Sequence, residues 1–522
     1  MNMESLVKEE LSENIGKGNI GLSSLKIGEF DILELYNEFC VDNKRKVISD
    51  ININMSLSGD LGLDSLNQVE LLVFIERRLK ISINPDEYSY VNSLMDLLDL
   101  INKEASTQED QDSLKLNITD LHRYVTKEIP HFYNDVTEQE GRKLRIKDKI
   151  VYDFASANYL GLDLDQRIFE RISSDLSKWG THPSWSRAIA SPQLYKELEE
   201  KISEVMDVPQ VLVFPTITLI HMGILPLLAI PNTLFLMDER VHKSVQEGVD
   251  LACAKGAHKK FFAHNDINTL RSELNNSQEY EQILVCIDGV YSMTGLDACL
   301  PEIIELIKSC PKVTLYIDDA HGFGLWGHSP SETNPYGIGG GGLLKKYKID
   351  IRKENVIYVA GLSKAFSSLA AFVTCRSLNE LENFATASTF MNSGPCPTAS
   401  LSSALTGLEI SQSLEGDQIR KRLYDLTKRF ITGIEQVGLV AKHENYFPLV
   451  SVEIGTIADV IEASKILWNC GILITPAVFP NAPIKQSMLR FTITAANTDE
   501  EIDAAIDALE IVRNQIPLAP YN

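Results

Sequence analysis

Three short stretches of the sequence carry residue types that can do covalent chemistry. Asp318-Asp319-Ala320-His321 offers a carboxylate and an imidazole, Ser363-Lys364 offers a primary amine, and Leu63-Asp64-Ser65-Leu66 offers a hydroxyl. A lysine amine can hold the aldehyde of pyridoxal 5'-phosphate (PLP), and a carboxylate can keep the pyridine nitrogen of that cofactor protonated. A serine hydroxyl can be esterified to a flexible arm that carries a thioester. One chain with both features indicates delivery of a tethered acyl group to a PLP-bound amino acid.

The elements that would position the carboxylate and the lysine are short apolar stretches that alternate with longer helical ones. The predicted strands are Val211–Phe214, Leu234–Met237, Ile283–Ile287, Val313–Ile317 and Val356–Ala360. This alternation predicts a mainly parallel sheet flanked by helices. Asp318 follows one strand and Lys364 follows another, and the carboxyl ends of such strands meet at the edge where ligands bind. Taken singly, either residue could instead be a buried carboxylate or a surface lysine.

Ser65 precedes a predicted helix over Asn67–Lys80 in a compact helical region, residues 28–105. The free amides and the dipole at a helix N-terminus favour a phosphodiester. The alternative is that Ser65 only caps the helix. Other apolar positions at helical spacing predict further buried faces: Ile32, Leu35, Tyr36 and Phe39, and Leu94, Leu97, Leu98 and Ile101.

The rest of the chain divides by composition. Residues 1–27 form a leader of unknown role, and residues 106–117 are polar without periodicity, which predicts a flexible linker. Residues 118–522 form the large α/β part, which becomes a smaller α+β subdomain over about residues 411–515.

Length and composition exclude several classes. The 522 residues are 44% hydrophobic, enough for a large enzyme core and a small module, and no apolar run reaches the ~18 residues of a membrane span. The N-terminus lacks the apolar segment of a secretion signal. Eight cysteines without a Cys-x-x-Cys pair predict neither a disulfide framework nor a metal site, and indicate a reducing, cytoplasmic environment.

The net charge of −23 is concentrated near the N-terminus. Residues 1–116 hold 22 acidic and 11 basic residues, a balance of −11. This argues against nucleic acid and against an anionic membrane as partners. It suits a small acidic module that docks on basic patches of enzymes, although a generic solubilising charge is the alternative.

The string Leu61-Gly62-Leu63-Asp64-Ser65-Leu66, followed by Val69-Glu70-Leu71, resembles acyl carrier proteins over roughly residues 28–105. The resemblance implies a four-helix bundle with 4'-phosphopantetheine on Ser65. It also implies a phosphopantetheinyl transferase and an acyl-loading enzyme as partners.

A second resemblance covers about residues 118–515. In chain order its markers are Asn158-Tyr159-Leu160-Gly161, Ser186-Arg187, Leu198-Glu199, Asp238 with His242 and Ser244, Gly289-Val290-Tyr291-Ser292-Met293, Asp318-Asp319-Ala320-His321-Gly322, Ser363-Lys364 and Leu489-Arg490. Together they resemble the α-oxoamine synthases, the branch of fold-type I PLP enzymes that includes aminooxononanoate synthase, 5-aminolevulinate synthase, 2-amino-3-ketobutyrate ligase and serine palmitoyltransferase. This implies an α/β large domain with a smaller C-terminal α+β domain.

The resemblance implies a role for each residue of the PLP site. Lys364 would form the Schiff base and remove the Cα proton, and Asp318 would pair with the pyridine nitrogen. His321 would hydrogen-bond the ring hydroxyl, His242 would stack on the ring, and Ser292 would lie beside the Schiff base.

It also implies the residues around that site. The turn Thr216-Ile217-Thr218 would hold the phosphate, and Ser393 would reach the phosphate of a neighbouring subunit, which implies a homodimer. Arg490 and Asn158 would bind the carboxylate of the amino acid.

The activity implied is a decarboxylative condensation in natural-product biosynthesis. A small α-amino acid (glycine, alanine or serine) and an acyl thioester carried on Ser65 would give an α-aminoketone and CO2. Departures from the family pattern, such as Ala157 in place of an asparagine and Tyr195 in place of a histidine, leave the choice of amino acid and acyl chain open. The alternatives are an aminotransferase of the same fold, or a synthase that uses a separate acyl-CoA or acyl-carrier donor while the fused carrier only docks.

Overall fold

The computed structural model describes residues 29–42, 51–79, 83, 91–105, 125–443, 445–478 and 487–516. The predicted leader over 1–27 and the linker over 106–117 lie outside these residues. The chain divides into two compact units, Met1–Leu57 with Val69–Lys115, and Ser58–Gln68 with Leu116–Asn522.

The carrier region contains three helices among its described residues: α2 (Glu29–Asp42), α3 (Ser65–Leu79) and α5 (Leu94–Ala105). The predicted apolar faces of α2 and α5 are buried, with Ile32, Phe39, Leu94 and Ile101 each fully enclosed. Helix formation here follows from burial of these amphipathic faces. The fourth helix of the predicted bundle stays a prediction.

The large sheet of the C-terminal unit has the strand order β4-β10-β9-β8-β7-β5-β6. Five neighbouring strands, from β9 to β6, run parallel, and β10 runs antiparallel to both of its neighbours. The bounds are β4 (Gln210–Phe214), β5 (Thr233–Asp238), β6 (His258–Phe262), β7 (Gln282–Asp288), β8 (Val313–Asp318), β9 (Val356–Gly361) and β10 (Ala371–Cys375). All five predicted strands are present, and β6 and β10 are additional.

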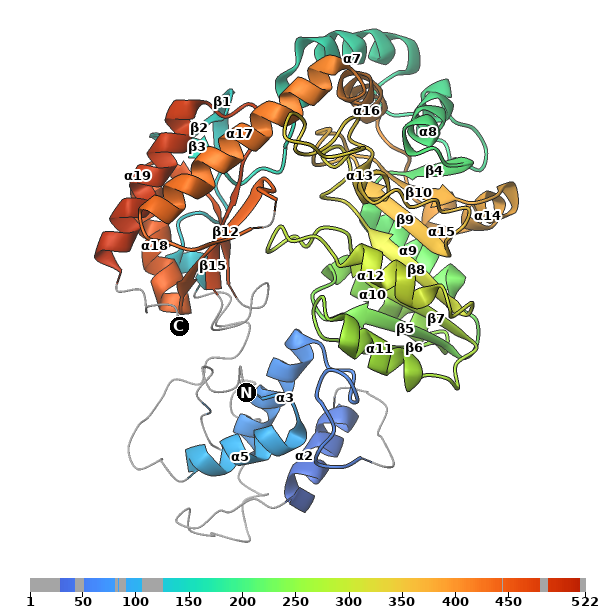
Figure 1. The fold of residues 1–522 in the computed structure, drawn as a ribbon, viewed down its shortest axis with the longest axis vertical. Coiled ribbons are helices and arrows are strands. Elements are labelled where there is room, and N and C mark those ends of the chain that lie inside the picture. The colour runs from blue at the N-terminus through green and yellow to red at the C-terminus, as the bar shows by residue number, and fades with distance from the viewer. Residues whose placement is uncertain are drawn as a thin grey trace, which may run out of the picture. The chain divides into compact units, whose positions relative to one another are not determined.

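Helices cover both faces of this sheet (Figure 1). In β7, Ile283, Val285 and Ile287 belong to one apolar core, and Leu284 and Cys286 belong to a second core on the opposite face. Burial on both faces explains why these strands are continuous apolar runs rather than alternating ones. The helices of this part are α7 (Gln166–Trp179), α8 (Gln193–Met206), α9 (Ile217–Leu228), α10 (Lys243–Cys253), α11 (Ile267–Asn275), α12 (Leu300–Ile307), α13 (Gly342–Lys346), α14 (Leu378–Phe384), α15 (Ser388–Met391) and α16 (Thr398–Ser411), with a 3-10 turn η1 (Leu162–Leu164).

A smaller α+β domain follows α16 and also includes strands from before the large sheet (Figure 1). Its two sheets have the orders β1-β2-β3-β13 and β11-β12-β15-β14. The strands are β1 (Val136–Glu140), β2 (Lys143–Ile146), β3 (Lys149–Asp153), β11 (Ala441–Lys442), β12 (Leu449–Gly455), β13 (Ile472–Leu473), β14 (Thr475–Ala477) and β15 (Ser487–Thr492), and the helices are α17 (Leu414–Gln436), α18 (Ile457–Asn469) and α19 (Asp499–Gln515). Because β3 pairs with β13, the subdomain predicted over 411–515 also includes residues 136–153.

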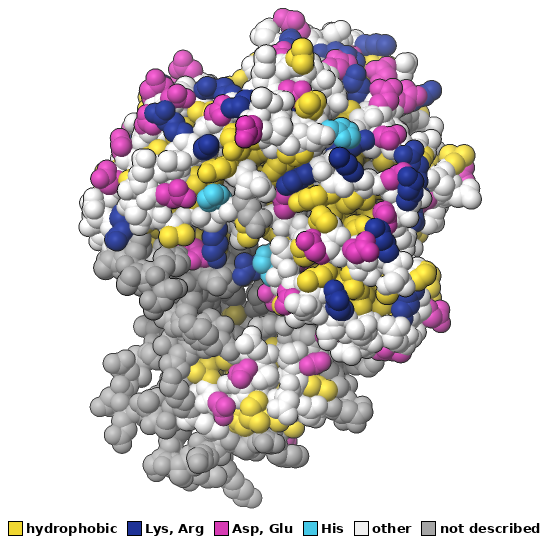
Figure 2. Space-filling model, in the orientation of Figure 1, with side chains coloured by type: hydrophobic (Ala, Val, Ile, Leu, Met, Phe, Trp, Pro, Cys, Tyr) yellow, Lys and Arg dark blue, Asp and Glu magenta, His cyan; other side chains and the backbone are white. Residues whose placement is uncertain are grey.

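The face of the C-terminal unit drawn in Figure 2 mixes acidic and basic side chains rather than gathering one sign into a broad area. Exposed ion pairs also occur in this unit, such as those of Arg167 with Asp165 and Glu415. Such surface pairs contribute little to stability.

Candidate active site

A pocket lies at the edge of the large sheet where β7 and β8 end. Asp288 and Asp318, the last residues of these strands, are register partners. The loop that follows β9 brings Lys364 to the same edge, as predicted for the carboxyl ends of parallel strands. The lining residues are Ile217, His242, Asp288, Val290, Ser292, Asp318, Ala320, His321 and Lys364.

Asp318 is held as a carboxylate by a histidine behind it. The Oδ2 atom of Asp318 lies 3.0 Å from His221 Nε2, and His221 Nδ1 lies 2.9 Å from the Tyr316 hydroxyl. Burial alone would raise the pKa of Asp318, but the hydrogen bond and charge of His221 and the charge of Lys364 bring it below the ordinary value. His221 was not among the residues predicted from the sequence. Its one signal is an imidazole in the middle of helix α9, whose other side chains are apolar apart from Thr218.

Asp288 behaves in the opposite way. Burial and the negative charge of Asp318 raise the pKa of Asp288 well above its ordinary value. Its Oδ1 atom accepts a hydrogen bond of 3.0 Å from the backbone amide of His242. The pKa values of these two carboxyl groups are therefore shifted in opposite directions, as expected for two buried acids that face the same space. The sequence analysis also missed Asp288.

Lys364 lines this pocket with its amine uncommitted. Burial lowers the pKa of the Lys364 ammonium, and the charges of Asp318 and Asp288 only partly oppose this. Within the described part of the chain, no ion pair or side-chain hydrogen bond involves the Lys364 amine. A lysine with a lowered pKa and no fixed partner is suited to act as a nucleophile and as a base.

His321 is buried beside the lysine and bonded to a tyrosine. Its Nδ1 atom lies 2.7 Å from the Tyr159 hydroxyl. Burial, and then the charges of Lys364 and Arg490, lower the pKa of His321 well below its ordinary value. Burial raises the pKa of Tyr159, so its hydroxyl keeps its proton and can donate to Nδ1. In the tautomer that accepts this bond, the neutral ring has Nε2 as its N–H donor.

His242 caps helix α10 from the mouth of the pocket. Its Nδ1 atom accepts from the backbone amide of Ser244 at 3.3 Å and lies 2.7 Å from the Ser244 hydroxyl. Burial of the ring against the pocket lowers the pKa of His242, although the nearby Asp318 opposes this. The ring is thereby available as a neutral surface, and its predicted stacking role stays a prediction.

The first turn of helix α9 reaches the pocket through Ile217. The Thr216 side chain caps this helix by accepting from the Leu219 amide at 3.3 Å. Backbone amides at a helix start, together with two threonine hydroxyls, are a donor set that suits a phosphate. Thr216, Ile217 and Thr218 therefore have the predicted chemistry, and phosphate binding by them remains a prediction.

Arg490 connects the small domain to the loop that carries Ser292. The Nη1 group donates to the Ser292 carbonyl at 3.0 Å, and Nη2 lies 3.5 Å from the Thr475 hydroxyl. The Nε group is buried without a hydrogen-bond partner. Among the described residues, no carboxylate pairs with this guanidinium. Arg490 is thus a half-buried cation with an unused donor, which suits an anionic ligand.

Asn158 and Ser393 lie outside the pocket lining, as do Thr216, Thr218 and Arg490. Asn158 neighbours Tyr159 in the chain, and its carbonyl accepts from the Gly161 amide at 2.8 Å. The Ser393 hydroxyl donates to the Gly394 carbonyl at 3.0 Å and lies at the surface. Contact of Ser393 with a second subunit stays a prediction.

Ser65 is the first residue of helix α3. The Asp64 side chain accepts from the Asn67 amide at 2.8 Å, and the Asp64 carbonyl accepts from the Gln68 amide at 2.9 Å. Asp64 therefore performs the capping that Ser65 was considered for as the alternative. This geometry fits a serine whose role is attachment of an arm.

The pocket fits PLP. It offers an amine for the aldehyde, an ionised carboxylate for the pyridine nitrogen, and a neutral histidine whose N–H suits the ring hydroxyl. The amides at the start of α9 suit the phosphate. Elsewhere, no group of three metal-ligating side chains gathers within the described ranges. Nor does any described helix have the length and apolar character needed to cross a membrane.

Comparisons with known proteins agree with this assignment. The family model for aminotransferase class I and II matches residues 149–509, and the model for a phosphopantetheine attachment site matches residues 44–101. An 8-amino-7-oxononanoate synthase from Thermosipho melanesiensis is 29% identical over 72% of this chain and 92% of its own length. A serine palmitoyltransferase from Sphingobacterium spiritivorum is 26% identical over 75% of this chain and 93% of its own.

Solved structures show the same fold. A serine palmitoyltransferase from S. paucimobilis has a TM-score of 0.69 at 19% identity, covering 76% of this chain and 97% of that one. An 8-amino-7-oxononanoate synthase from Francisella tularensis has a TM-score of 0.58 at 20% identity, covering 70% and 98%. The predicted PLP and phosphopantetheine cofactors are confirmed, and so is the similarity to α-oxoamine synthases. The chain therefore belongs to the aminotransferase class I and II family and carries a phosphopantetheine attachment domain ahead of it.

Proposed function

We propose that this protein condenses a small α-amino acid (glycine, alanine or serine) with an acyl thioester carried by the phosphopantetheine arm on its own Ser65. A bond forms between the amino acid Cα and the thioester carbonyl carbon, and the C–S bond breaks to free the arm's thiol. The carboxylate leaves as CO2, and an α-aminoketone remains. The observation that carries this proposal is the presence, in one chain, of an attachment serine at a helix start and a lysine in a PLP-type pocket.

PLP, when bound, supplies an electron-accepting ring that stabilises negative charge at the Cα atom. Lys364 holds the cofactor in the resting protein and is the base that takes the Cα proton. Its lowered pKa, caused first by burial, leaves more of the neutral amine at a given pH than an exposed lysine has. The same amine can return a proton to Cα after CO2 leaves, and the released thiolate takes its proton from water, so the step is balanced.

The two carboxyl groups have different roles. Asp318, whose pKa is lowered and which is backed by His221, would keep the pyridine nitrogen protonated. The raised pKa of Asp288 favours its neutral form, which weakens any attraction of the Lys364 ammonium into an ion pair. His321 would donate its remaining N–H to the ring hydroxyl, His242 would stack on the ring, and Ser292 would lie beside the Schiff base.

Arg490 binds the carboxylate of the amino acid, with help from Asn158. Its side chain is half-buried and its Nε group is buried without a partner, so an incoming carboxylate can supply hydrogen bonds that the protein does not. The Arg490–Ser292 contact fixes this carboxylate site relative to the lysine. We further propose a homodimer, in which Ser393 reaches the phosphate site of the other subunit.

The carrier supplies the acyl donor at high local concentration. A tethered thioester reacts as an intramolecular partner, so its effective concentration depends on the tether and not on a free pool. A dedicated phosphopantetheinyl transferase adds the arm and an acyl-loading enzyme charges it. We place the reaction in natural-product biosynthesis, because a fused carrier delivers one pathway's acyl chain rather than a shared CoA ester.

The test uses full-length protein whose Ser65 arm is charged with a defined acyl group by a broad-specificity phosphopantetheinyl transferase and the matching acyl-CoA. Glycine, alanine and serine, each labelled at the carboxyl carbon, are added separately. The expected result is an α-aminoketone by mass spectrometry, labelled CO2, and loss of the acyl mass from the arm. Ser65→Ala, given the same acyl group as free acyl-CoA, is the matched control.

Each other outcome points to a named alternative. Release of a keto acid without CO2 identifies an aminotransferase. Equal turnover by Ser65→Ala with acyl-CoA, or with a separately charged carrier protein, shows that the fused carrier is not the delivery arm. Deacylation of the arm without any aminoketone would contradict the proposal entirely.

A further inference from the structure

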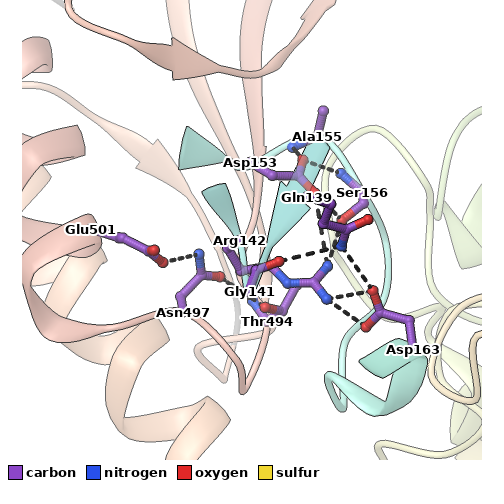
Figure 3. A network of polar contacts seen from close by, with 10 residues as sticks. All are labelled: Gln139, Gly141, Arg142, Asp153, Ala155, Ser156, Asp163, Thr494, Asn497 and Glu501. Atoms are coloured by element: carbon purple, nitrogen blue, oxygen red, sulfur yellow. Dashed lines mark hydrogen bonds and ion pairs between the residues drawn. The ribbon is translucent and has the colours of Figure 1, made fainter. Parts of the chain in front are cut away.

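Arg142, at the start of the β1–β2 hairpin's second strand, is only 1% exposed. Its Nη2 group lies 2.5 Å from both carboxylate oxygens of Asp163, and its Nη1 group donates to the Ser156 hydroxyl at 3.3 Å and lies 3.8 Å from Asp153 Oδ2. Figure 3 shows the guanidinium pointing into this group of side chains. A buried arginine that contacts two carboxylates is costly to desolvate, so its position calls for an explanation.

The two carboxylates mark the ends of one segment of chain, residues 153–163. Asp153 ends β3, and its Oδ1 atom accepts from the amides of Ala155 and Ser156 at 2.9 and 3.0 Å. Asp163 lies in the 3-10 turn that closes the segment. The backbone carbonyl of Arg142 also accepts from the Asp153 amide at 2.8 Å. Arg142 therefore holds both ends of the segment with one side chain and its own backbone.

The middle of this segment carries Tyr159, whose hydroxyl bonds to His321 at 2.7 Å. The Tyr159 carbonyl is held separately, by the Ala495 amide at 2.8 Å. The turn that contains Ala495 is closed by Asn497, which accepts from Thr494 and donates to Glu501 at 3.1 Å (Figure 3). Tyr159 thus has three supports: the clamp on its segment, the turn that holds its backbone, and the histidine.

We infer that Arg142 is a positioning residue for the PLP pocket. By clamping both ends of residues 153–163 it fixes the Tyr159 hydroxyl, which in turn fixes the tautomer and position of His321. Arg142 touches neither cofactor nor substrate; it acts through Tyr159. The effect of Arg142 on catalysis rests on the proposed function, in which His321 donates to the cofactor. The effect of Arg142 on the position of His321 is independent of that function.

The experiment measures how fast diethylpyrocarbonate modifies His321 in the full-length protein, by peptide mass mapping. His221, also fully buried and in contact with Asp318, is the internal reference. We compare Arg142→Lys and Arg142→Met with Tyr159→Phe, which removes the hydroxyl and leaves the clamp. Arg376→Lys is the matched control, since Arg376 pairs with Glu380 and Asn355 at the opposite edge of the sheet, where β9 begins.

Both Arg142 variants and Tyr159→Phe are expected to raise the rate at His321 by about tenfold or more through local opening, while His221 stays protected. Arg142→Lys combined with Tyr159→Phe is expected to match Tyr159→Phe alone, because both act through one hydroxyl. In PLP-loaded protein, the pH midpoint of the visible absorbance of the cofactor on Lys364 should shift in these variants and not in Arg376→Lys.

Equal rises at His221 and His321 would show general loosening and overturn the inference, as would an unchanged rate at His321 or additive effects in the double variant. If Arg142→Met does not fold, Arg142→Lys still decides the question. These measurements need no turnover. A shifted His321 rate in a protein that makes no aminoketone therefore counts against the proposed function alone.

Discussion

Two pairs of aspartates have different surroundings and different consequences. Buried Asp153 and half-buried Asp163 share the guanidinium of Arg142, which forms direct contacts with both. Asp288 and Asp318 share a pocket whose one lysine forms no ion pair among the described residues, and their pKa values are shifted in opposite directions. Because Arg142 is fixed between its two carboxylates, that group is a structural clamp. Because Lys364 has no fixed partner among the residues that the structure describes, its amine is available to react.

The strongest test of this comparison removes the amine. Lys364→Ala is expected to lower the rate of aminoketone formation by about 10³-fold or more, because the base and the cofactor anchor are lost together. The visible absorbance of the cofactor should lose its lysine-bound band. Lys353→Ala, at an exposed position, is the control. Retention of the band in Lys364→Ala would show that another amine holds the cofactor.

The next largest effect is expected at the clamp. Arg142→Met leaves buried Asp153 and half-buried Asp163 without their cation. Removing one partner of a buried ion pair typically costs about 3–5 kcal/mol of unfolding free energy. Denaturant unfolding of the C-terminal unit, compared with Arg376→Lys, measures this. Adding Asp153→Asn and Asp163→Asn should recover much of the loss. If the triple variant is no more stable than Arg142→Met, charge is not what the guanidinium contributes.

Asp319 is another buried aspartate, and its pKa can be tested through the pH dependence of unfolding. Asp319 accepts from Tyr358 at 2.6 Å and from the Leu343 amide at 2.8 Å, and burial raises its pKa to about 7. An unfolded aspartate loses its proton near pH 4. Between about pH 5 and 7 the folded state therefore binds one more proton than the unfolded state. The free energy of unfolding consequently falls as pH rises through this range. We expect a fall of roughly 2 kcal/mol over this window.

Asp319→Asn should flatten this dependence, because an amide does not titrate. Unfolding free energies of both proteins at several pH values are the measurement. Parallel curves for the two proteins would show that Asp319 is ionised throughout.

The smallest effect is expected on PLP affinity, from changing Tyr316, which contacts the His221 side chain that supports Asp318. Tyr316→Phe removes the hydroxyl that orients His221, one hydrogen bond worth about 1 kcal/mol, so PLP affinity should fall about fivefold. Equilibrium titration of PLP checks this, with Tyr280→Phe as a control outside the site. An unchanged affinity would show that His221 needs no orienting partner to hold Asp318 ionised.

The sequence predicted the parts of the fold and site that depend on local pattern. Continuous apolar runs marked five of the strands, and placement after a strand marked Asp318 and Lys364. The antiparallel strand Ala371–Cys375 was missed because nothing local distinguishes its direction. His221 and Asp288 were missed for a related reason: each acquires its role from a residue far away in the chain that only folding brings close.

The same limit applies to Arg142. Its partners lie 11 to 21 residues away, and its inferred target, His321, is reached only through Tyr159. The resemblance to known families supplied roles for the residues that touch the cofactor. It gave none to the side chains that hold those residues in place.

The cap at the start of helix α3 has a consequence for the order in which the carrier domain folds and is modified. The amide of Asn67 donates to the Asp64 side chain, so this cap of the helix does not use the hydroxyl that is esterified. The carrier domain can therefore complete its folding as it leaves the ribosome and receive its prosthetic arm later. The modifying enzyme meets a finished helix, and maturation can be timed by the supply of that enzyme.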